Sequence, residues 1–352
     1  MNSNPEISFS TRIRKSPFFD STMKWGCKGF TVYNRMYMPT YYKTFVEDYW
    51  SLVNDVTLWD VAGERQVEIT GSDAEKFIEY ITPRDISKCK IGQCMYILLT
   101  EKDGGIVNDP VLLKLNENHF WLSIADSDVL LWCKGIASSM NYNVNIIEPD
   151  VSPLALQGPK APEVMSKIVG TWVKELSFFY FKETTIENIP VVIARSGWSG
   201  ESGYEIYLRD KLLGNTLWEL IMNAGKEYNI APATPSQINR IESGMLSYGS
   251  DMTLNENPFD IGLERLVDLN KQVNFLSKGE IRKLELFRLI IEQKKLWILD
   301  EPYIGLDEPT NELINETFRS HIKSNGMIFF SSHHCPELQN METINLENYA
   351  NN

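Results

Sequence analysis

The sequence predicts an α+β fold followed by a short α/β segment of different character. From about residue 53 to residue 269, short apolar runs typical of strands alternate with stretches typical of helices. After residue 274 the order becomes helix, apolar strand, polar helix and second apolar strand, which is the pattern of a parallel βαβ unit. With 352 residues, 43% of them hydrophobic, the chain is long enough to bury the cores of two domains.

The first region contains clear strand and helix signals. "RQVEIT" (65–70) alternates apolar and polar residues, as a half-buried strand does. In the stretch that follows, Ser72 or Asp73 can cap an amphipathic helix. The apolar face of that helix consists of Ala74, Phe77, Ile78 and Ile81. Further on, "MYILLT" and "VLLKL" flank the turn-rich "EKDGGIVNDP" (101–110), which predicts a hairpin or a strand-loop-strand unit.

The last region predicts one βαβ unit. Residues 296–299 form a short apolar run, residues 312–323 a polar helical stretch, and residues 327–330 a second apolar run. An Asn-Gly pair at 325–326 supplies the turn before the second run. We therefore expect a parallel pair of strands joined by a helix.

Composition excludes several classes of protein. The formal net charge of −13 provides no basic field for nucleic acid or for an anionic membrane surface. No apolar run approaches the roughly 20 residues of a membrane-spanning helix, and the first residues have no signal-peptide pattern, so we expect a cytoplasmic protein without membrane insertion. Five cysteines without a CxxC pair, and four histidines of which three follow residue 320, argue against a disulfide framework and a bound metal.

Five segments jointly resemble the aminomethyltransferase family, which comprises the T-protein of glycine cleavage and its tetrahydrofolate-binding relatives. The resemblance covers residues 1–272 and is closest to the branch that demethylates dimethylsulfoniopropionate. It implies a tetrahydrofolate-dependent methyltransferase with a small-molecule methyl donor, and tetrahydrofolate as cofactor. The matching segments are "LWDVAGERQVEITGSDA", "GGIVNDP", "LALQGPKA", "RSGWSGESGYEIYL" and "RIESGMLSYGSDM".

The resemblance assigns two carboxylates. Glu205, in "GYEI", would otherwise be interpreted as the solvent-facing position of an alternating strand, but the matching glutamate holds the pterin ring through its N–H donors. Asp109 would otherwise be a turn residue, and the resemblance makes it the catalytic aspartate. Asn108 replaces the first of the two aspartates that are usual in glycine-cleavage enzymes, which weakens any expectation of aminomethyl transfer.

Aromatic residues and one arginine complete the expected site. Tyr96 and Arg240 fall where the family contacts folate, although Arg240 could instead form a surface ion pair near Glu242. A sulfonium cation binds well to aromatic faces, at about 0.5–2 kcal/mol per contact. Trp198 is a candidate for both cofactor and substrate contact, and Tyr207 and Tyr33 are candidates for substrate contact; ordinary core packing is the alternative for each.

The last region resembles the C-terminal half of an ABC-transporter ATPase of the haem-exporter type. The resemblance marks a signature motif in "LSKGE" with Ser277 and Gly279, and a D-loop with Asp307. It also marks a Walker B pair, Asp300 and Glu301, and a switch histidine, His333. An incomplete P-loop-type fragment over residues 273–352 is the implied domain.

No G-x-x-x-x-G-K-[ST] segment occurs in the chain, so we do not expect ATP and magnesium to bind within it. Three functions stay open: a folate-dependent methyltransferase, a non-catalytic folate-binding protein, and an ATPase subunit or fragment. The first is favoured because its resemblance covers the longer part of the chain. An unfinished parallel sheet would expose apolar edges, so association through the C-terminal fragment is a further expectation.

Overall fold

The computed structural model describes residues 9–269, and after them 286, 288–289, 294–304, 306, 308–333, 342 and 344. The chain divides into two units, Met1–Asp268 and Leu269–Asn352. Ser277, Gly279 and Asp307 lie outside the described residues. None of the helices in the described part is both long and apolar enough to span a membrane.

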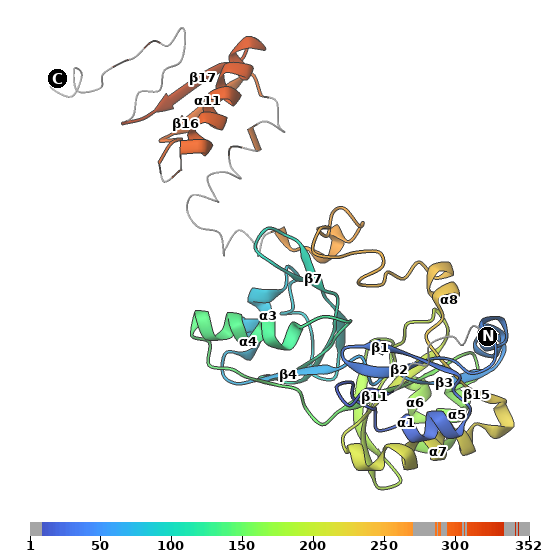
Figure 1. Cartoon of the computed structure of the whole chain (residues 1–352). Coiled ribbons are helices and arrows are strands. Elements are labelled where there is room, and N and C mark those ends of the chain that lie inside the picture. Colours follow the sequence, from blue (N-terminus) through green and yellow to red (C-terminus); the bar gives the residue numbers. More distant parts are fainter. Residues whose placement is uncertain are drawn as a thin grey trace. The chain divides into compact units, whose positions relative to one another are not determined.

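A six-stranded sheet forms one half of the first unit (Figure 1). Its order is β12-β13-β14-β11-β3-β15, and its neighbours are antiparallel except for β15, which runs parallel to β3. The strands are β3 (Val56–Asp60), β11 (Ser152–Gln157), β12 (Phe181–Ile186), β13 (Ile189–Ala194), β14 (Gly203–Leu208) and β15 (Ile230–Ala233).

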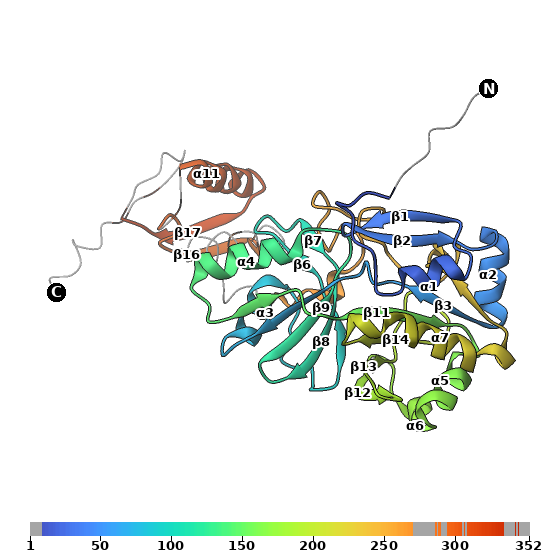
Figure 2. The same ribbon diagram turned by 60° about the horizontal axis from the view of Figure 1, so that its bottom comes forward.

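Helices cover one face of this sheet, as Figure 2 shows for α5 and α7. Their apolar side chains, such as Val164, Leu217 and Trp218, pack against Leu156 and Ile206 of the strands. The helices contributing to this core are α5 (Ala161–Val169), α6 (Trp172–Glu175) and α7 (Gly214–Ala224), and Phe18, directly before α1 (Phe19–Lys24), also packs into it.

A five-stranded antiparallel sheet forms the other half, in the order β10-β4-β9-β8-β5. The α3 helix (Ala74–Ile81) buries all four residues of its predicted apolar face, which confirms that prediction; Asp73 is its N-cap residue but its side chain makes no capping hydrogen bond. The strands are β4 (Gln66–Thr70), β5 (Cys94–Tyr96), β8 (Val111–Asn116), β9 (His119–Ser123) and β10 (Asn145–Ile147), and the second covering helix is α4 (Val129–Met140).

The predicted strand-loop-strand unit is also confirmed. β6 (Leu99–Thr100) and β7 (Ile106–Asn108) form a short antiparallel pair, while β5 pairs with β8. Asp109 therefore lies between β7 and β8, at the point where the chain leaves the hairpin for the five-stranded sheet.

The faces of the two sheets that carry no helices share one apolar cluster. Cys94, Leu113 and Trp121 of the five-stranded sheet pack with Val192 and Tyr207 of the six-stranded sheet. Because side chains alternate along a strand, Glu205 lies on the same face of β14 as Tyr207, between the sheets. The position of Glu205 is thus internal, not the solvent-facing one that simple alternation suggested.

Shorter elements complete the first unit. They are the hairpin of β1 (Gly29–Tyr33) and β2 (Met36–Tyr41), the helices α2 (Phe45–Asn54) and α8 (Gln237–Glu242), and three 3-10 turns at Lys211–Leu213, Lys226–Tyr228 and Glu264–Leu266.

The second unit contains the predicted parallel βαβ arrangement. β16 (Leu296–Asp300) pairs in parallel with β17 (Met327–Ser331), and α11 (Glu308–Lys323) connects them. The α11 helix begins at Glu308, whereas the sequence predicted a start at residue 312. Trp297, Tyr303, Ile314 and Phe318 form a small buried core.

Candidate active site

Asp109 and Tyr96 form the first pair of the site. The Tyr96 phenol, at the end of β5, donates a 3.0 Å hydrogen bond to Asp109 Oδ2. Burial raises the pKa of Asp109 to about 7, and the hydrogen bond from Tyr96 partly opposes that shift. Asp109 can therefore exchange a proton near neutral pH, which suits a general acid or base.

Two hydroxyl groups bind the same oxygen of the Glu205 carboxylate. Ser196 Oγ and the Tyr207 phenol donate hydrogen bonds of 2.5 and 3.0 Å, and both reach Glu205 Oε2. Oε1 has no hydrogen-bond donor among the residues that the structure describes. Burial raises the pKa of Glu205, while the two hydroxyl donors lower it. A buried carboxylate with one unused oxygen fits a ligand that presents N–H donors, as a pterin does.

Glu64 is a third carboxylate, which the sequence analysis did not select. It lies in the connection between β3 and β4, and its pKa is raised well above the ordinary value by burial and by the charges of Glu205 and Asp109. We call Glu64, Asp109 and Glu205 the carboxylate cluster. "AGER" has no motif that would mark Glu64, because its partners come from distant parts of the chain.

The two tyrosines expected to contact substrate both lie beside the cluster. Burial, then the charges of Glu64 and Asp109, raise the pKa of Tyr33. Tyr207 is completely buried, and its ring centroid lies 6.1 Å from that of Trp121. In this structure Tyr207 therefore acts on Glu205 through its hydroxyl, while Tyr33 keeps some accessible surface.

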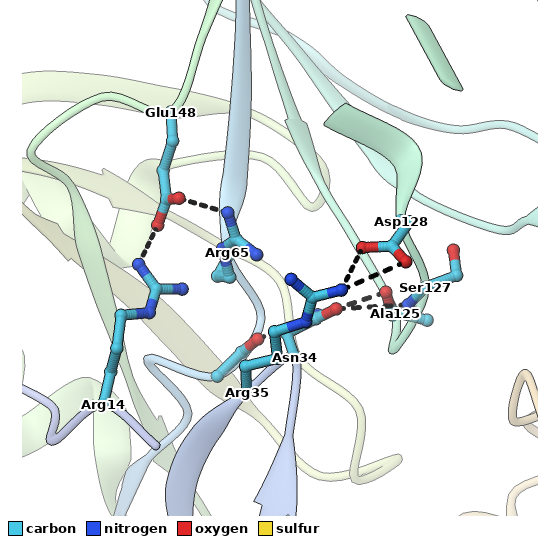
Figure 3. A network of polar contacts seen from close by, with 9 residues as sticks. Arg14, Asn34, Arg35, Arg65, Ala125, Ser127, Asp128 and Glu148 are labelled. Atoms are coloured by element: carbon cyan, nitrogen blue, oxygen red, sulfur yellow. Dashed lines mark hydrogen bonds and ion pairs between the residues drawn. The ribbon is translucent and has the colours of Figure 1, made fainter. Parts of the chain in front are cut away.

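The side chain of Asn108 is hydrogen-bonded to the loop that contains Ala125 and Ser127. Its Nδ2 donates to Ala125 O and Ser127 Oγ, at 3.1 and 2.9 Å, and its Oδ1 accepts from Ala125 N at 3.1 Å. Asn34 fixes the same loop from the β1–β2 turn, donating to Ala125 O and accepting from Ser127 N (Figure 3). The substitution of asparagine for aspartate at 108 thus serves loop attachment, since a carboxylate could not donate to Ala125 O.

Two ion-pair groups flank that loop. Figure 3 shows Arg14 and Arg65 both directed at Glu148, and Arg35 directed at Asp128. Arg65 follows Glu64 directly, so this charged contact anchors the connection that carries Glu64. The pKa of Glu148 is lowered because the hydrogen bonds of Arg65 and Arg14 outweigh its desolvation.

Arg240 and Trp198 form a separate pair. The Arg240 guanidinium lies 5.7 Å from the Trp198 ring centroid, and the Trp198 indole donates to Leu246 O at 3.1 Å. Arg240 is buried and pairs with Asp251, so the alternative of a surface ion pair near Glu242 was wrong. The guanidinium also donates to Met245 O and thereby holds the 245–251 loop.

That loop brings Tyr248 to the site. Tyr248 packs in an apolar cluster with Tyr96, and burial and the charge of Asp109 raise its pKa. The sequence offered only the segment "LSYGSD" as a signal, and did not single out Tyr248.

The described ATPase-like residues of the second unit lie together at the carboxyl ends of its strands. Ser331 Oγ donates to Asp300, and His333 Nε2 lies 3.6 Å from Glu301 Oε1. No group of three or more histidine, cysteine, aspartate or glutamate side chains suited to a metal occurs within the described ranges.

The two-sheet fold thus holds two carboxylates, Asp109 and Glu205, with hydroxyl donors, which suits a site for a small polar ligand. The GCVT N-terminal domain profile matches residues 18–271, and the chain belongs to this aminomethyltransferase family. Enzymes of the family use tetrahydrofolate to transfer one-carbon groups.

Individual relatives agree with this membership. The dimethylsulfoniopropionate demethylase DmdA of Ruegeria pomeroyi is 41% identical over 272 residues, which cover 77% of this chain and 74% of the relative. An aminomethyltransferase of Thermoanaerobacter pseudethanolicus is 30% identical, with the same two coverages. The crystal structure of aminomethyltransferase T from Bartonella henselae superposes with a TM-score of 0.68 at 25% identity, covering 78% of this chain and 75% of that one. These relatives give no support to the ATPase resemblance of the last region.

Proposed function

We propose that this protein transfers a methyl group from dimethylsulfoniopropionate, or a closely similar sulfonium, to tetrahydrofolate. The observation that carries the proposal is the unused Oε1 of Glu205 together with the protonatable Asp109, two carboxylates whose charges both act on Glu64, in a chain 41% identical to a dimethylsulfoniopropionate demethylase. The two carboxylates then have different tasks. Glu205 binds the cofactor, and Asp109 handles a proton.

Tetrahydrofolate supplies the nitrogen that accepts the methyl group. Glu205 Oε1 would accept hydrogen bonds from the pterin, while Ser196 and Tyr207 fix the carboxylate through Oε2. Trp198 and Arg240 contribute an aromatic face and a cation to cofactor binding, and the contact of Arg240 with Asp251 orients that cation. These assignments make cofactor affinity depend on Glu205 above all.

Methyl transfer from a sulfonium requires alignment more than acid–base chemistry. The carbon–sulfur bond breaks with its electron pair left on sulfur, and the donor leaves as a neutral thioether. Asp109, held by Tyr96, would take up the proton that the folate nitrogen releases when it gains the methyl group. Tyr33 and Trp198 provide aromatic surface for the sulfonium. Tyr207 contributes indirectly, because its hydroxyl group holds Glu205 in place.

The test is conversion of dimethylsulfoniopropionate and tetrahydrofolate into 5-methyltetrahydrofolate and methylthiopropionate by the purified chain. We expect turnover by the wild type. Glu205→Ala should weaken tetrahydrofolate binding at least about tenfold, because a charge-assisted contact is lost. Glu187→Ala, on the β12–β13 turn, is the control and should bind normally. Tetrahydrofolate binding without turnover would favour a non-catalytic folate-binding protein.

We further infer a two-domain organisation, with residues 1–272 as the folate domain and residues 273–352 as an ATPase-like fragment that does not turn over ATP within one chain. The parallel βαβ unit, with Asp300, Glu301 and His333 at the carboxyl ends of its strands, supports the resemblance. The missing phosphate-binding segment opposes activity. ATP with magnesium should therefore produce no thermal shift; a stabilisation abolished by Glu301→Gln would revive the ATPase function.

A further inference from the structure

Gln157 is a buried polar residue to which the function proposed above gives no task. It is the last residue of β11, pairs with Gly203 of β14, and has no exposed surface. Directly paired residues of antiparallel strands point to the same face of a sheet, and so do residues two apart on one strand. Gln157 and Glu205 are therefore diagonal neighbours on the inner face of the six-stranded sheet.

The Gln157 amide is hydrogen-bonded to both ends of the loop between β13 and β14. Its Nε2 donates to Ser196 O at 3.2 Å and, in a longer contact, to Tyr204 O at 3.5 Å. Its Oε1 accepts from Ser199 Oγ at 2.7 Å, and the Ser199 side chain is buried as well. Breaking any of these bonds would leave a buried polar atom unpaired, so the amide fixes the conformation of the loop.

Two glycines allow the loop to pack tightly around this amide. A Cβ atom at Gly197 or at Gly203 would overlap with the Gln157 side chain, so neither position has space for a larger residue. The backbone after β11 also holds the loop, because Gly158 N donates to Ser202 O at 2.8 Å. The glycines and serines of "RSGWSGESG" (195–203) thus enclose one side chain.

The same loop carries two groups of the proposed cofactor site. Ser196, whose carbonyl accepts from Gln157, donates through its Oγ to Glu205 Oε2 at 2.5 Å. Trp198, which provides the aromatic face, directly precedes Ser199. The Gln157 amide therefore holds the chain on both sides of Trp198 and at the backbone of the residue that binds Glu205.

We propose that Gln157 is a positioning residue of the cofactor site, and that it acts by fixing the 195–203 loop. The fixed loop keeps Ser196 within hydrogen-bond distance of Glu205 and orients Trp198. This inference rests on the function proposed above. Because Gln157 is completely buried, it acts through the loop and not by touching the ligand. Loss of its amide should weaken tetrahydrofolate binding, since the Ser196 hydroxyl and the Trp198 ring would be misplaced.

A double-mutant cycle tests this role. Gln157→Met keeps the length of the side chain and removes its amide, and it should weaken tetrahydrofolate binding, measured by calorimetry, about tenfold. In a Ser196→Ala background the same substitution should weaken binding by only about threefold or less, because part of its effect acts through that hydroxyl group. Equal losses in the two backgrounds, or no loss in either, would overturn the role of Gln157.

The pH dependence of binding distinguishes positioning from a loss of stability. The Ser196 hydroxyl lowers the pKa of Glu205, so misplacing Ser196 allows that pKa to rise. The acidic limb of tetrahydrofolate affinity against pH should shift to higher pH in Gln157→Met and in Ser196→Ala alike. An unshifted limb in Gln157→Met would contradict the proposal. The other titratable groups whose charges interact with Glu205, all kept in these variants, are Tyr207, Cys94 and Glu64.

Two further variants control for misfolding. Ile221→Val loosens the helix-covered core on the opposite face of the same sheet, and it should lower the melting temperature without changing tetrahydrofolate affinity. Ser199→Ala removes one hydrogen bond to the Gln157 amide and is the milder variant if Gln157→Met does not fold. Ser199→Ala should weaken tetrahydrofolate binding about threefold and shift the acidic limb in the same direction.

The possible failures are distinguishable. A wild type that binds tetrahydrofolate, with unchanged affinity and pH dependence in both Gln157→Met and Ser199→Ala, overturns the role of Gln157 alone. A wild type that does not bind tetrahydrofolate overturns the proposed function together with this inference. Weaker binding in Gln157→Met, with a smaller loss in the Ser196→Ala background, supports both.

Discussion

The Tyr96 phenol and Asp109 Oδ2 are 3.0 Å apart, in a hydrogen bond that links the end of β5 to the residue after β7. The bond stabilises the ionised form of Asp109, and it opposes the burial that raises the pKa of this carboxyl to about 7. The proton affinity of the site is therefore set by a balance between desolvation and one hydroxyl group.

Tyr96→Phe should move the pH dependence of catalysis. Without the hydroxyl donor the pKa of Asp109 rises further, so the acidic limb of the kcat/KM profile should shift to higher pH by about one unit. The measurement is methyl transfer between pH 5.5 and 9. The control is Tyr228→Phe, which alters a tyrosine packed against the helix-covered core and should leave the acidic limb of the kcat/KM profile unchanged. An acidic limb that does not shift in Tyr96→Phe would contradict the assignment of Asp109 as the group that titrates.

Asp109→Asn should remove a pH-dependent contribution to the free energy of unfolding. Because the folded-state pKa of about 7 exceeds the ordinary 3.8, the folded protein binds more protons between these values. The contribution of the Asp109 carboxyl to the free energy of unfolding is therefore fully present below about pH 4 and is lost as the pH rises through 7. Urea unfolding should thus show the variant to be more stable than wild type at pH 8, by about 2–4 kcal/mol at most, with a much smaller difference at pH 4.

The same variant should have little methyl transfer activity. A gain in stability with a loss of activity is the expected signature of a functional carboxylate held in an unfavourable environment. Asp103→Asn, in the exposed part of the hairpin loop, is the matched control and should change neither property. Equal pH profiles of stability for wild type and Asp109→Asn would show that the carboxyl is not perturbed.

Asn108→Asp should destabilise the first unit. The carboxylate cannot donate to Ala125 O or Ser127 Oγ, and it would be buried with no solvent access. We expect a loss of about 2–4 kcal/mol in the free energy of unfolding. Asn116→Asp, at the exposed end of β8, should cost far less, and a similar small effect at both positions would refute the loop-attachment role of Asn108.

Ile298→Lys should reduce self-association through the second unit. Trp297 points to the α11 core, whereas Ile298 is 73% exposed and Phe329, its partner in β17, is 66% exposed. Parallel sheets are ordinarily covered on both faces, so we expect this face, which the described residues leave exposed, to support association. Light scattering should show less oligomer for Ile298→Lys than for the wild type. Glu316→Lys, on exposed α11 surface, controls for the added charge.

Local signals were sufficient for much of the fold. The apolar face of α3 followed from its helical spacing, and the strand-loop-strand unit that contains Asp109 followed from the turn-rich "EKDGGIVNDP" between two apolar runs. The parallel β16–β17 pair followed from two apolar runs separated by a polar helix. These elements depend on residues close in sequence, where periodicity and turn chemistry act directly.

The sequence by itself determined the family and, through its motifs, directed attention to Asp109 and Glu205. Only the tertiary structure brought Glu64 beside them, paired Arg240 with Asp251, and directed both donors of Glu205 to one oxygen. Such contacts arise when two sheets, built from strands far apart in the chain, pack face to face. No local pattern encodes which side chains then share a low-dielectric space, and that proximity is what sets their pKa values and their unmet hydrogen bonds.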